Sequence, residues 1–249
     1  MLNENLIDEN LLERALQVAT NHLKDTPFDH EVLFQLGNIY FVRGEYEEAF
    51  KNYQKASNLL PQVACYAINQ GHALRMLGEL EQATTVYQSV LHFNPRYADA
   101  HFYIGLIYFE NRDFDHAFSC FSQALLINPR YAAPRYYLGK LHQEMGEFRQ
   151  AMNEFRRVIE ECLGKNIHEI SITVNCGLIF SDAGLLEESE KYYRKLLKEH
   201  PDFADLHLQL GLVLKKLNKV DEALDEFHFA IKLNPQYMEA RRKYWESAR

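Results

Sequence analysis

The chain has 249 residues, of which 47% are hydrophobic, and its formal net charge is −8. This charge argues against a nucleic-acid partner, because proteins that bind nucleic acids neutralise phosphates with Lys and Arg. The simplest role of the excess acid is solubility.

The sequence also bears on the compartment. Four scattered cysteines form no Cys-x-x-Cys pair, which indicates reduced thiols in a reducing compartment, the cytoplasm. Residues 1–12 contain several acids and no apolar run, so no signal peptide is expected. No stretch approaches the roughly 18 apolar residues of a membrane helix, and we expect no membrane insertion.

Residues 1–29 predict one amphipathic helix ended by Pro27, which is an N-terminal cap or a half-repeat. Pro27 lies 34 residues before Pro61, and Ala15 lies 34 residues before Ala49, so this helix shares the spacing of the segments that follow. Its apolar stripe consists of Leu12, Ala15, Leu16, Ala19 and Leu23.

Residues 30–237 contain six copies of one pattern. A glycine, which we number as position 0, is followed by a small residue at +12, an aromatic residue at +16 and, in five copies, a proline at +24. The spacing is 34 residues except for one step of 38. The glycines are Gly37, Gly71, Gly105, Gly139, Gly177 and Gly211.

Each of these positions suggests a role in a pair of packed helices. Small residues at 0 and +12 are expected where the two helices cross, and the aromatic residue is expected to fill the space to the next pair. The proline ends the second helix. At +7, Gly or Asn suits a left-handed residue that closes the first helix. Arg112 occupies this position in the third copy, and its turn is unexplained by the sequence.

The four extra residues fall near 160–169, where Leu163 replaces the proline and Gly164 is expected to end a lengthened second helix. A tolerated loop insertion is the favoured interpretation, since longer loops cost little. The alternative is a functional break in the array. Residues 238–249 predict a C-terminal capping helix, in which Trp245 is expected to pack on the sixth repeat.

The sequence contains no common catalytic, nucleotide-binding or metalloprotease motif, so we expect no enzyme activity and no cofactor. Eleven histidines raise the question of a metal site. His101 and His207 share position −4 of their repeats, however, so the repeat explains them better than a ligand set does. We expect no metal.

The 34-residue period with Gly, Ala, an aromatic residue and Pro at these positions resembles the tetratricopeptide repeat over six units. The resemblance implies an all-α, right-handed superhelical solenoid of antiparallel helix pairs. It also implies that the first helix of each pair lines a concave groove that takes peptides, with positions −6, −3, −2, +1 and +4 facing inward. In the last two repeats these positions are Ser171, Val174, Asn175, Leu178 and Ser181, then Asp205, Leu208, Gln209, Leu212 and Lys215.

Two groups of side chains at these positions are candidates for peptide binding. Asparagines could bind a peptide backbone through their amides, and an aromatic centre could take an apolar anchor. The candidate groove residues are Phe34, Asn38, Asn69, His72, Phe102, Tyr103, Tyr136, Tyr137, Lys140 and Asn175.

The predicted function is a non-catalytic scaffold that binds a protein or peptide in this groove. The set of residues with which some relatives bind a chaperone's acidic C-terminus is incomplete here, since Phe34 and Asp99 stand where lysines are needed. Two alternatives stay open. The array is the substrate-recruiting region of a larger enzyme such as a protein glycosyltransferase, or it self-associates through its terminal units.

Overall fold

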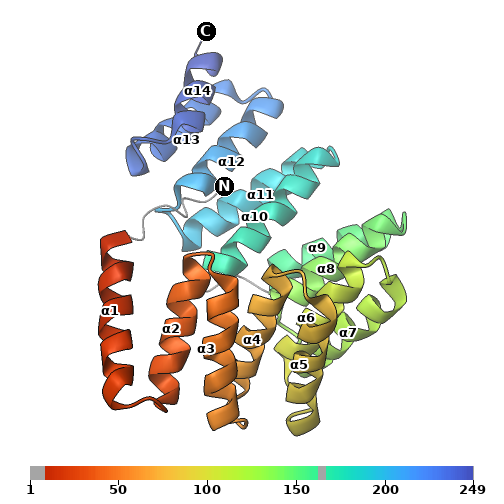
Figure 1. Ribbon diagram of the computed structural model, residues 1–249. Coiled ribbons are helices and arrows are strands. Elements are labelled where there is room, and N and C mark those ends of the chain that lie inside the picture. The colour runs from red at the N-terminus through yellow and green to blue at the C-terminus, as the bar shows by residue number, and fades with distance from the viewer. Residues whose placement is uncertain (1–8, 162–166, 249) are drawn as a thin grey trace. The chain divides into compact units, whose positions relative to one another are not determined.

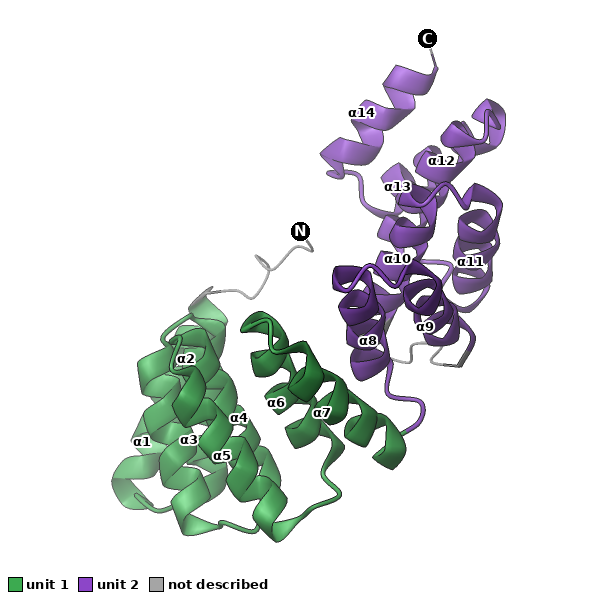
Figure 2. Cartoon of the chain, turned by 90° about the vertical axis from the view of Figure 1, so that its right-hand side faces the viewer, with its two compact units in different colours: residues 1–128 green, residues 129–249 purple. Residues whose placement is uncertain are grey.

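The computed structural model describes residues 9–161 and 167–248, and these ranges form fourteen α-helices and no strand (Figure 1). The chain divides into two compact units, residues 1–128 and 129–249 (Figure 2). Each unit is a stack in which successive helices run antiparallel. The predicted all-α array of helix pairs is confirmed within each unit.

The helices of the six repeats are of two alternating types: the first helix of a pair carries the glycine, and the second carries the aromatic residue. The first unit contains α1 (Glu9–Asp25), α2 (His30–Val42), α3 (Tyr46–Leu59), α4 (Ala64–Met76), α5 (Leu80–Phe93), α6 (Ala98–Glu110) and α7 (Phe114–Ile127). The second unit contains α8 (Ala132–Glu144), α9 (Phe148–Glu161), α10 (Ile167–Asp182), α11 (Leu186–Glu199), α12 (Ala204–Lys216), α13 (Val220–Leu233) and α14 (Met238–Ser247).

The turn inside each pair has the same geometry in all six repeats. After α2, the Gly44 amide donates to the Phe41 carbonyl at 3.0 Å and the Glu45 amide donates to the Tyr40 carbonyl at 2.9 Å. This hydrogen-bond pattern is the Schellman motif, which needs a left-handed residue. Arg112 takes that conformation with φ of 60° and makes the same two bonds to α6, which answers the question that its sequence position raised.

The core of each pair depends on the contact between its glycine and its aromatic ring. A Cβ atom on Gly37 would lie 2.5 Å from the ring carbon Cδ1 of Tyr53, which is closer than carbon atoms can pack. We expected the glycine to bring the two backbones together. Instead, it makes room for the ring of its own pair. Some rings also reach the next pair, since Tyr87 stacks on Tyr103 with centroids 5.6 Å apart.

The second helices end two residues before the repeat's proline. For example, α5 ends at Phe93 and α7 ends at Ile127, ahead of Pro95 and Pro129. The Asn94 before the first of these prolines lies outside the helical region, with φ of −135° and ψ of 86°, since a following proline disfavours helical backbone angles. Its side-chain oxygen accepts a hydrogen bond from the Arg96 amide at 3.2 Å, which fixes the turn.

Two sequence-based expectations about the outer helices need correction. In α1, Ala19 of the predicted apolar stripe is buried, but Ala15 of the same stripe is exposed, because no described helix covers that side of α1. In α14, Ala240 and Tyr244 pack on the core of the last repeat, whereas Trp245 points away and is exposed. The predicted end of the lengthened helix at Gly164 lies outside the described residues.

Candidate functional site

The surface of the first helices is the candidate site, and the structure separates the predicted inward positions into two groups. Position −3 faces the core: Phe34, Phe102 and Tyr136 contact the +16 ring of their own repeat, with centroids 5.6 to 6.0 Å apart. Phe102 is only 4% exposed. Its assignment to the groove is therefore wrong, because a residue at −3 lies about 100° around the helix from one at −2 and so faces the partner helix.

In the first unit, the predicted amides are already hydrogen-bonded. The side-chain oxygen of Asn38 accepts from the Tyr53 hydroxyl at 2.8 Å. The amide nitrogen of Asn69 donates to the Cys65 carbonyl of its own helix at 2.8 Å. Each side chain keeps only part of its capacity for a ligand, so these two residues do not form an open amide row.

The side chains of His72, Tyr87 and Tyr103 form a packed cluster on α4, α5 and α6. Nδ1 of His72 lies 2.9 Å from the Tyr87 hydroxyl, and its ring meets the edge of Tyr103 with centroids 4.1 Å apart. Burial, helped by the nearby Arg75 charge, lowers the pKa of His72 to about 4. His72 is therefore neutral near pH 7.

In the second unit, Tyr136, Tyr137 and Lys140 lie together on α8. The two rings meet edge to face with centroids 5.5 Å apart, and Nζ of Lys140 lies 5.9 Å from the Tyr136 ring centroid. This distance suits a cation–π contact. Burial raises the pKa of Tyr136 to about 12. Asn175 on α10 is exposed, so its amide is open to a ligand.

The tyrosines that we expected to form one aromatic centre belong to different units. Tyr103 lies on α6 in the first unit, whereas Tyr136 and Tyr137 lie on α8 in the second. Each group is therefore a separate candidate.

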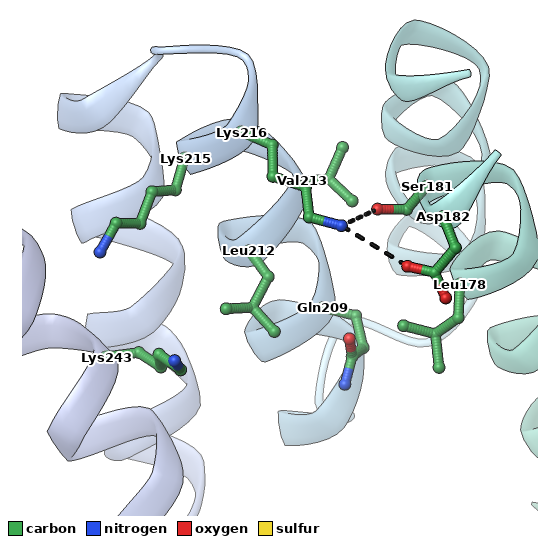
Figure 3. Close-up of a pocket in the computed structure, with 9 residues that line it drawn as sticks. All are labelled: Leu178, Ser181, Asp182, Gln209, Leu212, Val213, Lys215, Lys216 and Lys243. Atoms are coloured by element: carbon green, nitrogen blue, oxygen red, sulfur yellow. Dashed lines mark hydrogen bonds and ion pairs between the residues drawn. The ribbon is translucent and has the colours of Figure 1, made fainter. Parts of the chain in front are cut away.

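A hollow of about 430 Å³ opens on the surface of α10, α12 and α14 in the second unit (Figure 3). Leu178 and Leu212 at position +1 and Gln209 at −2 line it, as do Ser181 and Lys215 at +4. These five residues were among the predicted inward positions of the last two repeats, and here those positions converge on one space.

Three lysines surround this hollow, and they differ in their partners. Nζ of Lys216 donates to the Ser181 hydroxyl at 2.9 Å and lies 3.6 Å from an Asp182 carboxylate oxygen. Lys243 has a carboxylate neighbour at 3.4 Å on its own helix, Glu246. Among the described residues, no carboxylate lies within ion-pairing distance of the half-buried Lys215. Figure 3 shows Lys215 and Lys243 on one side of Leu212 and the Lys216 cluster on the other.

Lys215 is one of the predicted inward positions but not one of the candidate groove residues, and Lys243 belongs to neither set. A signal for Lys243 was present. If the repeat spacing of 34 is continued past Gly211, position 0 falls on Trp245, and Lys243 is then at −2, the position of Gln209. Applying the 34-residue spacing to residues 238–249 would therefore have predicted that Lys243 lies on the same surface as Gln209.

The histidines and cysteines have structural surroundings. His101 and His207 donate from Nε2 to the carbonyls of Pro95 and Pro201, at 3.1 and 2.9 Å. Within the described ranges, no three His, Cys, Asp or Glu side chains are grouped as the ligands of a metal ion would be. Cys65 and Cys120 are free thiols, Cys176 is buried in α10, and Cys162 lies outside the described residues.

The membrane prediction was tested on the helices. In the part of the chain that the structure describes, no helix is both long enough and apolar enough to cross a bilayer.

Five family models, described as TPR repeat or tetratricopeptide repeat, match this sequence. The matched residues are 30–63, 71–112, 98–131, 135–162 and 177–237. The chain belongs to the tetratricopeptide repeat family. The resemblance inferred from the 34-residue spacing is therefore confirmed, and the repeats account for most of the chain.

Solved structures share this fold. A chain in the crystal structure of the APC/C hetero-tetramer Cut9–Hcn1 is 14% identical with a TM-score of 0.60, and the match covers 96% of this chain but 46% of that one. This chain thus spans about half the length of that protein. A tetratricopeptide repeat protein from Parabacteroides merdae ATCC 43184 is 18% identical with a TM-score of 0.59, covering 98% and 95%. MamA 41-end from Desulfovibrio magneticus RS-1 is 22% identical with a TM-score of 0.53, covering 60% and 84%. At these identities the matches establish the solenoid fold alone.

Proposed function

We propose that this tetratricopeptide repeat protein is a non-catalytic scaffold that binds a peptide segment on the surface of its first helices. The observation that carries the proposal is the hollow on α10, α12 and α14, where apolar and cationic side chains of three consecutive first helices converge. The expected cytoplasmic location, in keeping with the free thiols, and the absence of a nucleic-acid partner belong to the same proposal.

The side chains around the hollow define the chemistry of the segment. Leu178 and Leu212 offer an apolar wall, and Lys215 and Lys243 offer ammonium groups beside it. A carboxylate next to an apolar side chain matches this arrangement, because charge-assisted hydrogen bonds to a carboxylate are stronger than neutral ones. The exposed amide of Asn175 is suited to a contact with the peptide main chain.

A selection from a random peptide display library tests this proposal. The 249-residue chain should enrich peptides that combine Asp, Glu or a free C-terminal carboxylate with Leu, Ile or Phe. The double variant Lys215→Ala/Lys243→Ala should then bind the best peptide at least about tenfold more weakly in fluorescence anisotropy, since each rim charge contributes little but the pair acts on one carboxylate.

The matched control is Lys195→Ala/Lys232→Ala, which removes the same charge from exposed positions of the second helices α11 and α13. Its affinity should match that of the unsubstituted chain. Equal losses in both variants would reduce the effect to net charge. A selection that enriches no peptide, or one whose peptides bind the Lys215/Lys243 variant unchanged, would contradict the proposed site.

A further inference from the structure

The helix α1 has an apolar side that the equivalent helices of complete repeats keep buried. By the repeat spacing of 34, Ala15 of α1 corresponds to Ala49 of α3. Ala49 is fully buried, whereas Ala15 is exposed. The neighbouring Leu11 and Val18 are 62% and 69% exposed. In α3 this side faces α2, the first helix of its pair, so the open side of α1 has the position that a first helix would cover.

A hollow of about 460 Å³ lies along this side, between α1 and α2, and Val32 and Ile39 of α2 line it together with the α1 residues. Their counterparts in α12 are Leu206 and Val213, which are buried. Within the array, a preceding first helix contributes to this cover: Phe34 of α2, for example, contacts the ring of Tyr66 in α4 with centroids 4.9 Å apart. The hollow thus has the location that a preceding first helix would occupy.

The helix α14 has the complementary property. Its Ala240 and Tyr244 pack on the preceding repeat, but the side that would face its own second helix is open. Trp245 lies on that side at position 0 and is 65% exposed. Every complete repeat has glycine at this position, so α14 departs from the pattern by the largest possible change in side-chain size.

In α14 the side chain is larger than the repeat pattern requires, whereas in α1 it is smaller. Its residue at the aromatic position is Ala19, where the complete repeats have Tyr or Phe. In those repeats a small residue on the first helix meets a large ring on the second, and the two share one space. With Trp245 and Ala19 the large side chain is on the first helix and the small one is on the second. The pair therefore still combines one large and one small side chain, as the complete repeats do.

We propose that α14 of one copy of this chain docks as a first helix on α1 and α2 of a second copy, with Trp245 lying over Ala19. A Trp at the centre of a small interface is a typical hot spot. The contact joins different surfaces of the two copies, so it can repeat and give a series of oligomers. The guanidinium of Arg242 lies at −3, where the complete repeats have an apolar residue, and it makes this junction weaker than an internal one.

Sedimentation velocity of the full chain over about 5 to about 500 µM tests the contact, a range that suits a small interface. The weight-average mass should rise with concentration. Trp245→Ala should weaken association at least tenfold. Phe93→Ala is the control, because Phe93 is an equally exposed aromatic residue on α5, and it should associate as the unsubstituted chain does.

A size exchange tests the register of the contact. Ala19→Tyr should block association, because the new ring and Trp245 compete for one space. The double variant Ala19→Tyr/Trp245→Gly should restore it, since it recreates the pairing of the complete repeats. Circular dichroism and thermal melting check that each variant folds. If Ala19→Tyr disturbs α1, Val18→Glu places a charge on the same side without entering the core and should also block association.

Three outcomes would overturn the proposal. The unsubstituted chain could remain a monomer throughout the range, which would leave the α1 side to a different partner. Trp245→Ala could associate as well as the control. Finally, association could be lost with Trp245→Ala yet survive Val18→Glu, which would indicate a contact between two α14 helices.

Discussion

The first-helix surfaces of the two units share a backbone frame but differ in what their side chains do. The inward side chains of α4 bond to neighbouring helices: His72 bonds to Tyr87 of α5, and Arg75 pairs with Glu110 of α6 at 2.9 Å. On α10 and α12, Leu178 and Lys215 at the corresponding repeat positions leave a hollow. The comparison shows that the glycine–ring frame does not determine the chemistry of the surface, so one unit can be closed while the other stays open to a ligand.

The largest effect is expected when the aromatic ring at position +16 is removed, because both units depend on this ring for their stability. Tyr87→Ala in the first unit and Tyr193→Ala in the second each delete a fully buried ring, and each should lower the free energy of unfolding by about 3–5 kcal/mol. Hydrogen exchange should show protection lost first in the substituted repeat and its neighbours. The exposed Phe93→Ala serves as control. Equal loss of protection along the whole chain would contradict the picture of locally additive repeats.

A change of pH should affect the stability of the two units differently, because one unit contains a histidine with a lowered pKa and the other a histidine with a raised pKa. His72 has a lowered pKa of about 4 through burial and the Arg75 charge, whereas the unfolded value is about 6.5. The unfolded chain therefore binds the proton first, and the stability that neutral His72 contributes is lost as pH falls from about 6.5 to about 4, by at most about 3 kcal/mol.

At His207, burial disfavours the charged imidazole, but the hydrogen bonds that it donates to the Glu226 carboxylate and the Pro201 carbonyl outweigh burial and raise the pKa. Its contribution is present below about 6.5 and is lost as pH rises through the folded value. As pH falls from 7.5 to 5, the protection factors of the backbone amides, which correct for the pH dependence of intrinsic exchange, should thus fall around α4 and α5 and rise around α12. His72→Gln and His207→Gln should each remove one trend; if both trends persist in the variants, other groups cause them.

The smallest effect is expected at the left-handed turn residues. Arg112 in the first unit and Asn218 in the second have φ of 60°, whereas the other four turns have glycine. Arg112→Gly should stabilise the chain by about 0.5 kcal/mol, because relief of backbone strain exceeds the loss of the guanidinium contact with Phe114 and the added freedom of the unfolded chain. Asn218→Gly should change less, since Asn tolerates this conformation. Urea unfolding measures both, and destabilisation by Arg112→Gly would show that its side chain matters more than its backbone.

Much of this fold was accessible from the sequence because the repeat itself carries the information. Six copies of a glycine, a ring and a turn residue predict the helix pairs, their boundaries and the left-handed turns. The orientation of the aromatic ring could not be predicted from the sequence. The contact between Gly37 and Tyr53 depends on the direction in which the ring points, and the residue spacing does not determine that direction.

The site was less accessible, because positions on a helix surface differ by only one residue in sequence. Phe102 and Tyr103 are adjacent, yet the first is core and the second reaches the surface. The hollow beside Lys215 depends on the size of the neighbouring side chains on three helices, and the exposure of Trp245 depends on whether another helix covers it. Both are properties of the assembled neighbours, and no single segment reveals them.

The bonds from position −4 to the proline carbonyls bear on how the array could be opened by a protease. Arg135 reaches the carbonyl of Pro129 at 2.8 Å, and His101 and His207 do the same for their prolines, so each side chain ties a turn to the helix that follows it. Ala67 occupies this position after Pro61 and has no polar atom to offer. The connection between α3 and α4 consequently lacks this tie, and proteolytic nicking of the folded chain would begin there rather than at the turns whose proline carbonyl is bonded.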